Sequence, residues 1–561
     1  MRLLRIDYLS LFLILIISFL FVWELFITPG RPATFDSSIH ISNIAQFSKV
    51  IEQKEFPVVW LNNTANYGLP IGIVAQQFTS YLGGLLNLIT NNPITTYNLL
   101  IFIAIFLSNI FLYFFLRFYF SPLASFLSTF IFTFTPYHIL NIYIRGAMVE
   151  FFSGIFLPLI LISFFLLIVK RKFSAFFLLT LSIAGLTLTH PMMLIVYSFL
   201  FIPYLFFLLI ISTLPKASKI KLMITSFIGI LLGLFISSYY IFPLNLEIKY
   251  FYYGLTKNHF EKDYYLSFIN FFSYQWYYFT DKEIFVRGNF IIFGLLETII
   301  LILGLLYVFY KKILKKSKDN INILSFILIV AILIIFFTTK YSDIFFQKIF
   351  FLNNIQFPWR FLSVLIFIPP IIFAFLYDLF SKKIIALLLI SIVAFLSFGQ
   401  LYGKNFSIYP NKSYLSSKEN LYSIQMNTIW TGKSENYPDR EEQGGIIMGK
   451  GEITRYVLKN SSRNYDVYAN TPLRMIDRTF YFPGWNVYVD NVKTDIEFQD
   501  PNYRGVITYN VPAGKHTVLV AFEDTKIRLF GKILSIISLS LFFVLFFLRK
   551  RLSKIFNIFK H

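Results

Sequence analysis

Long apolar segments recur along the chain from residue 8 to about residue 400, with polar connections between them. The first of them, from Tyr8 to Thr28, carries one charge, Glu24, and is long enough to cross a bilayer as a helix. The spans predicted after it are 98–116, 122–138, 150–169, 173–190, 192–212, 222–242, 289–310, 321–338, 360–379, 383–400 and 528–548. The pattern predicts a polytopic α-helical membrane protein with about 12 transmembrane helices.

Basic residues predict the orientation of these spans. The chain starts with a short basic stretch, and no small-residue cleavage site follows the first apolar run, so we interpret that run as a retained span. Basic residues then recur in the connections after every second span, at Arg117, 170–172, 216–221, 311–318, 382–383 and 549–551. Because positive charge marks the cytoplasmic side, both termini are predicted to be cytoplasmic. Residues 29–97 then form an external loop, with short helices along the membrane surface.

The composition changes after the eleventh predicted span. Residues 401–525 are polar, and short alternating runs are separated by turn signals. The predicted strands are 465–469, 485–489, 505–509 and 516–520, with a turn at 512–515. We therefore expect three parts: a transmembrane domain over 1–400, an extracytoplasmic β-sandwich over 401–525, and a final helix with a basic tail over 526–561.

Composition excludes several classes of protein. The chain is 57% hydrophobic and 20% aromatic, more than a soluble core can hide. It contains no cysteine, which rules out disulfides, thiolate metal sites and a cysteine nucleophile. The net charge of +21 comes from basic residues in short loops, so it indicates topology and not a nucleic-acid partner.

Asp36 and His40 lie just beyond the first span, and their four-residue spacing puts both side chains on one face of a helix. A carboxylate beside an imidazole can take a proton from a hydroxyl, orient it or hold a metal. The alternative is structural, with Asp36 as a helix N-cap and His40 as an interfacial residue. Residue chemistry alone leaves both interpretations open.

Further ionisable residues gather at the same predicted membrane face. Arg145 and Arg360 are natural phosphate binders, because a guanidinium forks onto phosphate oxygens and stays charged. Glu150 follows Arg145 by five positions across a predicted break at Gly146, where it can pair with Arg145 or act as a second carboxylate. Taken singly, each arginine is equally well explained as an interfacial anchor. The whole cluster on one face favours function.

Three other residues complete the candidate binding set. Trp359 adjoins Arg360, and His138 and His190 stand near external ends of predicted spans. A metal site built from His40, His138 and His190 lacks tight ligand spacing, so we predict none. A lone histidine such as His190 is also common as a hydrogen-bonded packing residue.

The chain resembles the bacterial membrane proteins called 6-pyruvoyl-tetrahydropterin-synthase-related and their YfhO-type relatives. Both are similar to the GT-C superfamily of polytopic, lipid-sugar-dependent glycosyltransferases. The residues that carry the resemblance are Asp36-Ser37-Ser38-Ile39-His40, Arg145-Gly146-Ala147-Met148-Val149-Glu150, Gln356-Phe357-Pro358-Trp359-Arg360 and Phe482-Pro483-Gly484-Trp485 with Val511-Pro512-Ala513-Gly514-Lys515-His516. Nothing in the sequence suggests a pterin site.

The resemblance implies an inverting sugar transfer at the outer face of the bacterial cell membrane. The donor would be a polyprenyl-phosphate-linked sugar, and the acceptor a cell-envelope glycan, lipid or protein. Asp36 would be the general base, with His40 and Glu150 orienting it or the acceptor, and Arg145 and Arg360 would hold the lipid phosphate. The first loop has no Asp-x-Asp motif, so no metal or other cofactor is expected.

Two other functions stay open at this stage. A lipid or oligosaccharide transporter, or flippase, would need ionisable residues near mid-membrane and inverted repeats, and the spans here are nearly free of charge at their centres. A non-catalytic scaffold with a glycan-binding external domain is disfavoured only by Asp36, Arg145 and Glu150. The glycosyltransferase interpretation requires these three residues and Arg360 to surround one cavity.

Overall fold

The computed structural model describes most of the chain. The described residues are 4–252, 264–273, 291–313, 322–380, 382–401, 406–408, 410–414, 427–431 and 437–556. Part of the predicted basic loop at 311–318 and parts of the predicted β-domain lie outside these ranges.

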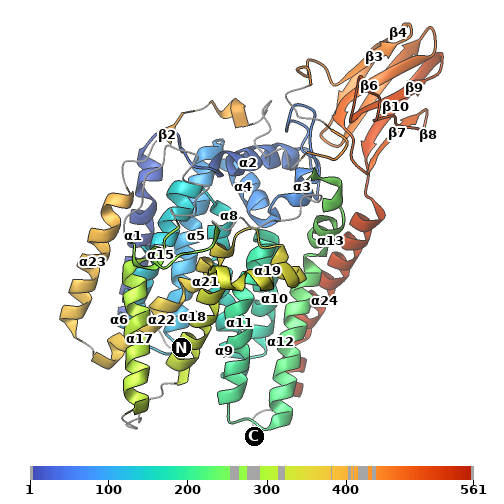
Figure 1. Ribbon diagram of the computed structural model, residues 1–561. Helices are drawn as coiled ribbons and strands as arrows, with labels where there is room; N and C mark the ends of the chain where they lie inside the picture. The colour runs from blue at the N-terminus through green and yellow to red at the C-terminus, as the bar shows by residue number, and fades with distance from the viewer. Residues whose placement is uncertain are drawn as a thin grey trace.

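Long helices run side by side through most of the molecule (Figure 1). They are α1 (Arg5–Ile27), α5 (Pro93–Leu116), α6 (Pro122–Thr133), α9 (Phe156–Ile168), α10 (Ser174–Thr189), α11 (Pro191–Ile211), α12 (Lys216–Ile236), α17 (Leu295–Ile313), α18 (Asn322–Thr338), α22 (Ile368–Phe380), α23 (Lys383–Leu401) and α24 (Lys526–Phe556). By length and composition, seven helices of the described chain can cross a membrane, or up to nine if each bent pair is one span. The polytopic helical architecture is confirmed, and the count of twelve stays a prediction.

Two of the predicted spans are bent. The helix that starts at α6 turns by 44° before continuing through α7 (Pro136–Ile139) and the π-helix η1 (Leu140–Arg145). The second bend, of 83°, follows α18 and leads into α19 (Asp343–Lys348). Pro136 explains the first bend, because proline cannot donate the backbone hydrogen bond that would continue the helix.

Three shorter helices lie across one end of the bundle: α2 (Ser37–Glu52), α3 (Ile71–Val74) and α4 (Gln77–Thr90) (Figure 1). Two glycines allow α2 and α4 to approach closely. A Cβ on Gly83 would lie 2.7 Å from the Ile44 side chain, and one on Gly84 would lie 3.0 Å from the Ser48 backbone nitrogen. Larger residues at either position would push the two helices apart.

The C-terminal β-domain stands beyond this same end of the bundle (Figure 1). One sheet has the order β4 (Gly451–Leu458), β5 (Ser462–Ala469), β10 (Gly514–Phe522), β7 (Trp485–Val489), β8 (Val492–Thr494); the other has β3 (Gly444–Met448), β6 (Leu473–Phe480), β9 (Val506–Val511). All pairings are antiparallel. Residues of both sheets share one buried apolar cluster, which contains Val487 and Val518 from the first and Met475 and Val511 from the second. The four strands predicted from the sequence are present.

The segment between α2 and α3 packs into the β-domain. Trp60 meets Trp485 edge-on, with ring centroids 5.2 Å apart, and both belong to the β-domain's apolar cluster. Asn460 donates to the Trp60 carbonyl oxygen at 2.8 Å, and the Phe480 nitrogen donates to the Tyr67 carbonyl oxygen at 3.1 Å. The loop and the β-domain therefore form one packed unit.

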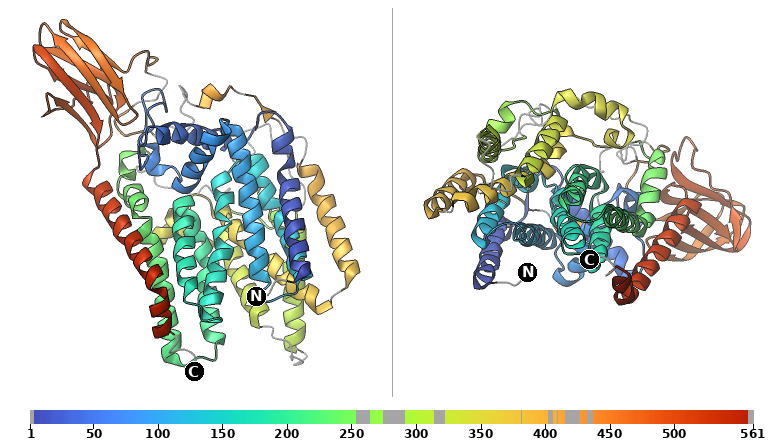
Figure 2. Two further views of the ribbon diagram at one scale, coloured as in Figure 1. Left: turned by 180° about the vertical axis from the view of Figure 1, so that it is seen from behind. Right: turned by 90° about the horizontal axis from the view of Figure 1, so that it is seen from below.

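The last helix, α24, connects the β-domain to the helical bundle. α24 packs along α12 and α13 (Ser238–Leu246), as the view from behind shows (Figure 2). Arg528 in its first turn pairs with the buried Glu247 at 3.1 Å and donates to the Pro483 carbonyl oxygen of the β-domain. The guanidinium thus joins three parts of the chain.

A surface ion pair in the β-domain gives a pH-dependent prediction. His516 Nδ1 lies 2.6 Å from Asp490 Oδ2, and this contact raises the pKa of His516 and lowers the pKa of Asp490. The pair adds stability below the ordinary histidine pKa of about 6.5 and loses it as the pH rises through the raised value. On the acid side, the contribution disappears as the pH falls through the lowered pKa of Asp490.

NMR titration of the full-length protein with labelled histidine checks this, since the chain has only six histidines. We expect the His516 pKa to lie above about 6.5 and to return toward that value in Asp490→Asn. Equal values in the two proteins would contradict the prediction.

Candidate functional site

Asp36 begins helix α2 without capping it. The residue occupies the N-cap position, but within the described part of the chain its side chain makes no capping hydrogen bond. Its backbone nitrogen instead donates to the Arg145 carbonyl oxygen at 2.8 Å. The structural alternative, in which the Asp36 carboxylate caps the helix N-terminus, therefore does not apply.

Gly146 makes this close approach feasible. Its φ is +70°, in the left-handed region that favours glycine. A Cβ at this position would collide with the Thr34 side chain and would lie 2.8 Å from the Ser37 backbone nitrogen. The break predicted at Gly146 thus has two physical causes, the backbone conformation and the packing of the segment that carries Asp36.

The π-helix η1 ends at Arg145, and α8 (Met148–Ser153) starts just after the turn at Gly146. This path folds Glu150 back toward Arg145. Both Nη atoms of Arg145 lie 3.1 Å from Glu150 Oε2. The two residues are five positions apart and would not share a helical face, so the break itself creates the ion pair.

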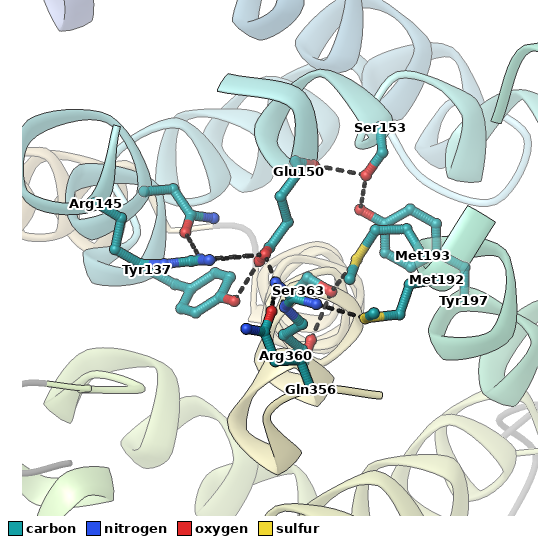
Figure 3. A network of polar contacts seen from close by, with 11 residues as sticks. Tyr137, Arg145, Glu150, Ser153, Met192, Met193, Tyr197, Gln356, Arg360 and Ser363 are labelled. Carbon is teal, nitrogen blue, oxygen red and sulfur yellow. Dashed lines mark hydrogen bonds and ion pairs between the residues drawn. The ribbon is translucent and has the colours of Figure 1, made fainter. Parts of the chain in front are cut away.

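Glu150 is the centre of a buried polar network (Figure 3). Its Oε1 accepts a hydrogen bond from the Tyr137 hydroxyl at 2.5 Å. Its Oε2 accepts from Arg145 and lies 3.5 Å from Nε of Arg360. A carboxylate with both oxygens engaged by donors is stabilised in its charged form and is poorly placed to take a further proton.

Arg360 enters the site on η5 (Pro358–Phe361), far along the sequence. It donates to Gln356 Oε1 at 3.1 Å and to the sulfur of Met192. The neighbouring Trp359 lies under the other arginine, with the Arg145 guanidinium carbon 4.4 Å from the ring centroid. The indole face attracts the cation through a cation–π interaction.

One cavity of about 250 Å³ collects most of the candidate residues. Six of the residues singled out from the sequence line it: Asp36, His40, Arg145, Glu150, His190 and Arg360. The four residues that the glycosyltransferase interpretation requires around one cavity are among them. The polar residues that sequence reasoning did not single out for this site are Asn43, Gln76 and Gln356.

The cavity is lined from separate parts of the chain. Asp36, His40 and Asn43 come from one face of α2, at positions i, i+4 and i+7. The helical period therefore could have indicated Asn43, whereas nothing local marks Gln76. Arg145 and Arg360 come from the segments around η1 and η5. The cavity thus combines a carboxylate and neutral polar groups from α2 with two guanidinium groups from other segments.

Burial lowers the pKa of His40; the charge of Asp36 opposes this change, and Arg145 adds to it. A neutral imidazole one helical turn from Asp36 can donate one hydrogen bond and accept another.

Two predicted binding residues do not line the cavity. The Trp359 ring lies against the Arg145 guanidinium group, as described above. His138 packs edge-on against Phe132 and Phe151, with ring centroids 4.5 and 5.0 Å away. In the described ranges, no group of three or more histidine, aspartate and glutamate side chains is arranged to hold a metal ion.

A family model described as the 6-pyruvoyl-tetrahydropterin synthase related domain of membrane proteins matches residues 77–407. The chain belongs to this family. The matched region contains Arg145, Glu150 and Arg360 but neither Asp36 nor the β-domain. No curated protein matches the sequence.

Solved structures with a distant likeness include two glycosyl-transferring proteins. The oligosaccharyltransferase of Archaeoglobus fulgidus is 13% identical, with a TM-score of 0.42 over 75% of this chain and 60% of its own. The arabinofuranosyltransferase AftD from Mycobacteria is 12% identical, with a TM-score of 0.42 over 72% of this chain and 28% of its own. The chain thus spans less than two thirds of either protein.

The conformation of Gly146 yields a direct test. Gly146→Ala should lower the thermal unfolding temperature in detergent, because the left-handed backbone alone costs about 1–2 kcal/mol for an L-residue and the new methyl group meets Thr34. Gly445→Ala is the matched control, since its φ is not positive and the nearest side-chain atom would lie 3.4 Å from the new Cβ. Equal unfolding temperatures for the two variants would contradict the assignment.

Proposed function

We propose that this protein is a membrane glycosyltransferase that moves a sugar from a polyprenyl-phosphate-linked donor to an acceptor hydroxyl. One observation carries the proposal: a carboxylate that does not cap its own helix shares a cavity with two guanidinium groups. A phosphate-linked donor and a hydroxyl acceptor need these two chemistries side by side.

Asp36 is the general base in this mechanism. The acceptor hydroxyl gives its proton to the carboxylate while its oxygen bonds to the anomeric carbon of the sugar. The bond between that carbon and the donor's phosphate oxygen breaks, and the electron pair leaves with the lipid phosphate. A single displacement inverts the anomeric carbon. His40, on the same face of α2, orients the carboxylate or the acceptor.

Arg145 and Arg360 hold the phosphate and stabilise the charge that develops as it leaves. Glu150 serves as a positioning residue, because it accepts from Tyr137 and lies against both arginines. Its contacts orient both guanidinium groups before the phosphate binds. His190 lines the same cavity and supplies a further hydrogen-bonding group. His138, packed among aromatic rings, has no role in this scheme.

We infer that the reaction takes place at the extracytoplasmic face of the bacterial cell membrane. Support comes from the basic connections, which put the termini in the cytoplasm and the β-domain outside. The cavity is lined in part by α2 and by residues 74–76, at the junction of α3 and α4, and these helices lie across the β-domain's end of the bundle. The lipid carrier reaches it from the bilayer, and the acceptor is a hydroxyl of the cell envelope.

Asp36→Asn should reduce transfer by about 10²–10⁴-fold, the usual contribution of a general base, while donor binding persists. The measurement uses protein purified in lipid vesicles with a panel of radiolabelled undecaprenyl-phosphate sugars, and it follows release of undecaprenyl phosphate. Asp524→Asn, a surface carboxylate paired with Lys532, is the matched control. Equal release from both variants would reject Asp36 as the base. No release by wild type from any donor would favour a transporter or scaffold, and lipid translocation would then be measured in the same vesicles.

Arg360→Met should weaken binding of undecaprenyl phosphate by about tenfold or more, because charge-assisted hydrogen bonds contribute about 1.5–3 kcal/mol each. Lys340→Met, which removes a cation from the exposed turn after α18, should leave the affinity unchanged. Affinity measured in nanodiscs separates the two. If the Arg360 variant binds undecaprenyl phosphate as tightly as wild type, Arg360 does not hold the phosphate.

A further inference from the structure

The outward face of the larger β-sheet carries a row of polar and aromatic side chains. In the strand register, Tyr468 of β5 stands between Glu452 of β4 and Lys515 of β10. The adjacent outward-facing pair is Asp466 and Thr517. Successive outward-facing residues of a strand lie two positions apart, so these five residues form one continuous surface.

This surface is hollowed into a groove of about 650 Å³. The size falls within the range of small-molecule pockets in proteins. Tyr468 is 42% exposed, which leaves part of its ring available to a ligand. The other polar residues that line the groove are Glu452, Thr454, Asp466, Asp490, Lys515, His516 and Thr517.

One wall of the groove is rigidly built. Asp490 and Asn491 form the two-residue turn between β7 and β8, and both have positive φ, the pattern of a type I′ hairpin. The Asp490 carboxylate accepts from the Thr517 backbone nitrogen at 2.9 Å and from the His516 ring at 2.6 Å. These contacts tie the turn to β10 and hold the carboxylate in place.

The chemistry of the lining selects a class of ligand. Carboxylates only accept hydrogen bonds, Lys515 only donates, and the threonine hydroxyls do both. A matching ligand must therefore donate and accept at closely spaced points, and it must also offer a flat apolar face to Tyr468. Sugar rings combine these features, whereas the carboxylates of the groove repel phosphates and nucleic acids. Within the described residues, these carboxylates belong to no group arranged to hold a metal ion.

We propose that this groove binds a neutral oligosaccharide. The groove lies at the start of β10, and α24 follows soon after the end of that strand. The groove is lined by residues of the β-domain alone, and none of them lines the cavity beside Asp36. It therefore holds a glycan without reacting with it and serves as a tether to carbohydrate of the cell envelope. This role does not depend on the proposed transferase activity.

The test measures binding of neutral tetrasaccharides (glucans of two linkages, mannan and chitin fragments) to full-length protein in nanodiscs by saturation-transfer NMR. We expect at least one to bind, and Tyr468→Ala to weaken it about tenfold through the lost stacking face. Tyr468→Phe keeps the ring and should retain binding. Tyr456→Ala is the matched control, because that tyrosine is 65% exposed on β4 and is not among the groove-lining residues.

Three outcomes would overturn the proposal: no tetrasaccharide binds, the Tyr468→Ala and Tyr456→Ala variants bind equally well, or calorimetry finds that calcium ions bind the groove in place of sugars. Transferase assays on Tyr468→Ala with small soluble acceptors separate the two proposals, because an intact active site should keep its rate there. Unfolding temperatures of all variants establish that each is folded.

Discussion

The buried carboxylate of Glu150 is the constraint around which the site is assembled. Charged groups at this depth are expensive to bury, and they are retained only when each one has partners. Tyr137 and Arg145, from the continuous α7–η1 helix, and Arg360, from η5, supply those partners. Removing one member of such a cluster leaves an uncompensated charge, at a cost of about 3–5 kcal/mol. The same interactions that hold these helices together therefore also orient the groups that face the cavity.

A second set of contacts supports helix α2. Residues 53–69, between α2 and α3, pack against the β-domain through Trp60 and Asn460. A buried chain of hydrogen bonds continues from this loop into α2, from Thr64 to Gln46 and then through Ser42 to the Tyr414 carbonyl oxygen. The helix that follows Asp36 is thus held in place by residues from distant parts of the sequence.

Local patterns were enough to predict the helical architecture, four of the strands and most of the polar residues that line the cavity. Hydropathy is a property of neighbouring residues, and the i, i+4 spacing of Asp36 and His40 is likewise local. What sequence reasoning missed is long-range. Neither Gln76 nor the interlock of residues 53–69 with the β-domain has a local signature, because their partners are distant in sequence. For His138, the local pattern was misleading. A polar residue near the end of a predicted span suggested a binding role, whereas its side chain packs among aromatic rings.

The interlock between loop and β-domain has a consequence for biosynthesis. The carbonyl of Trp60 is bound by a residue 400 positions later in the chain. At translation rates of about 5–20 residues per second, the loop waits on the order of 20–80 s for its partner. During that interval its tryptophan and tyrosine side chains have no β-domain to cover them. The packing of this loop is thus completed late in synthesis, which makes a nascent or truncated chain a natural client for chaperones and proteases.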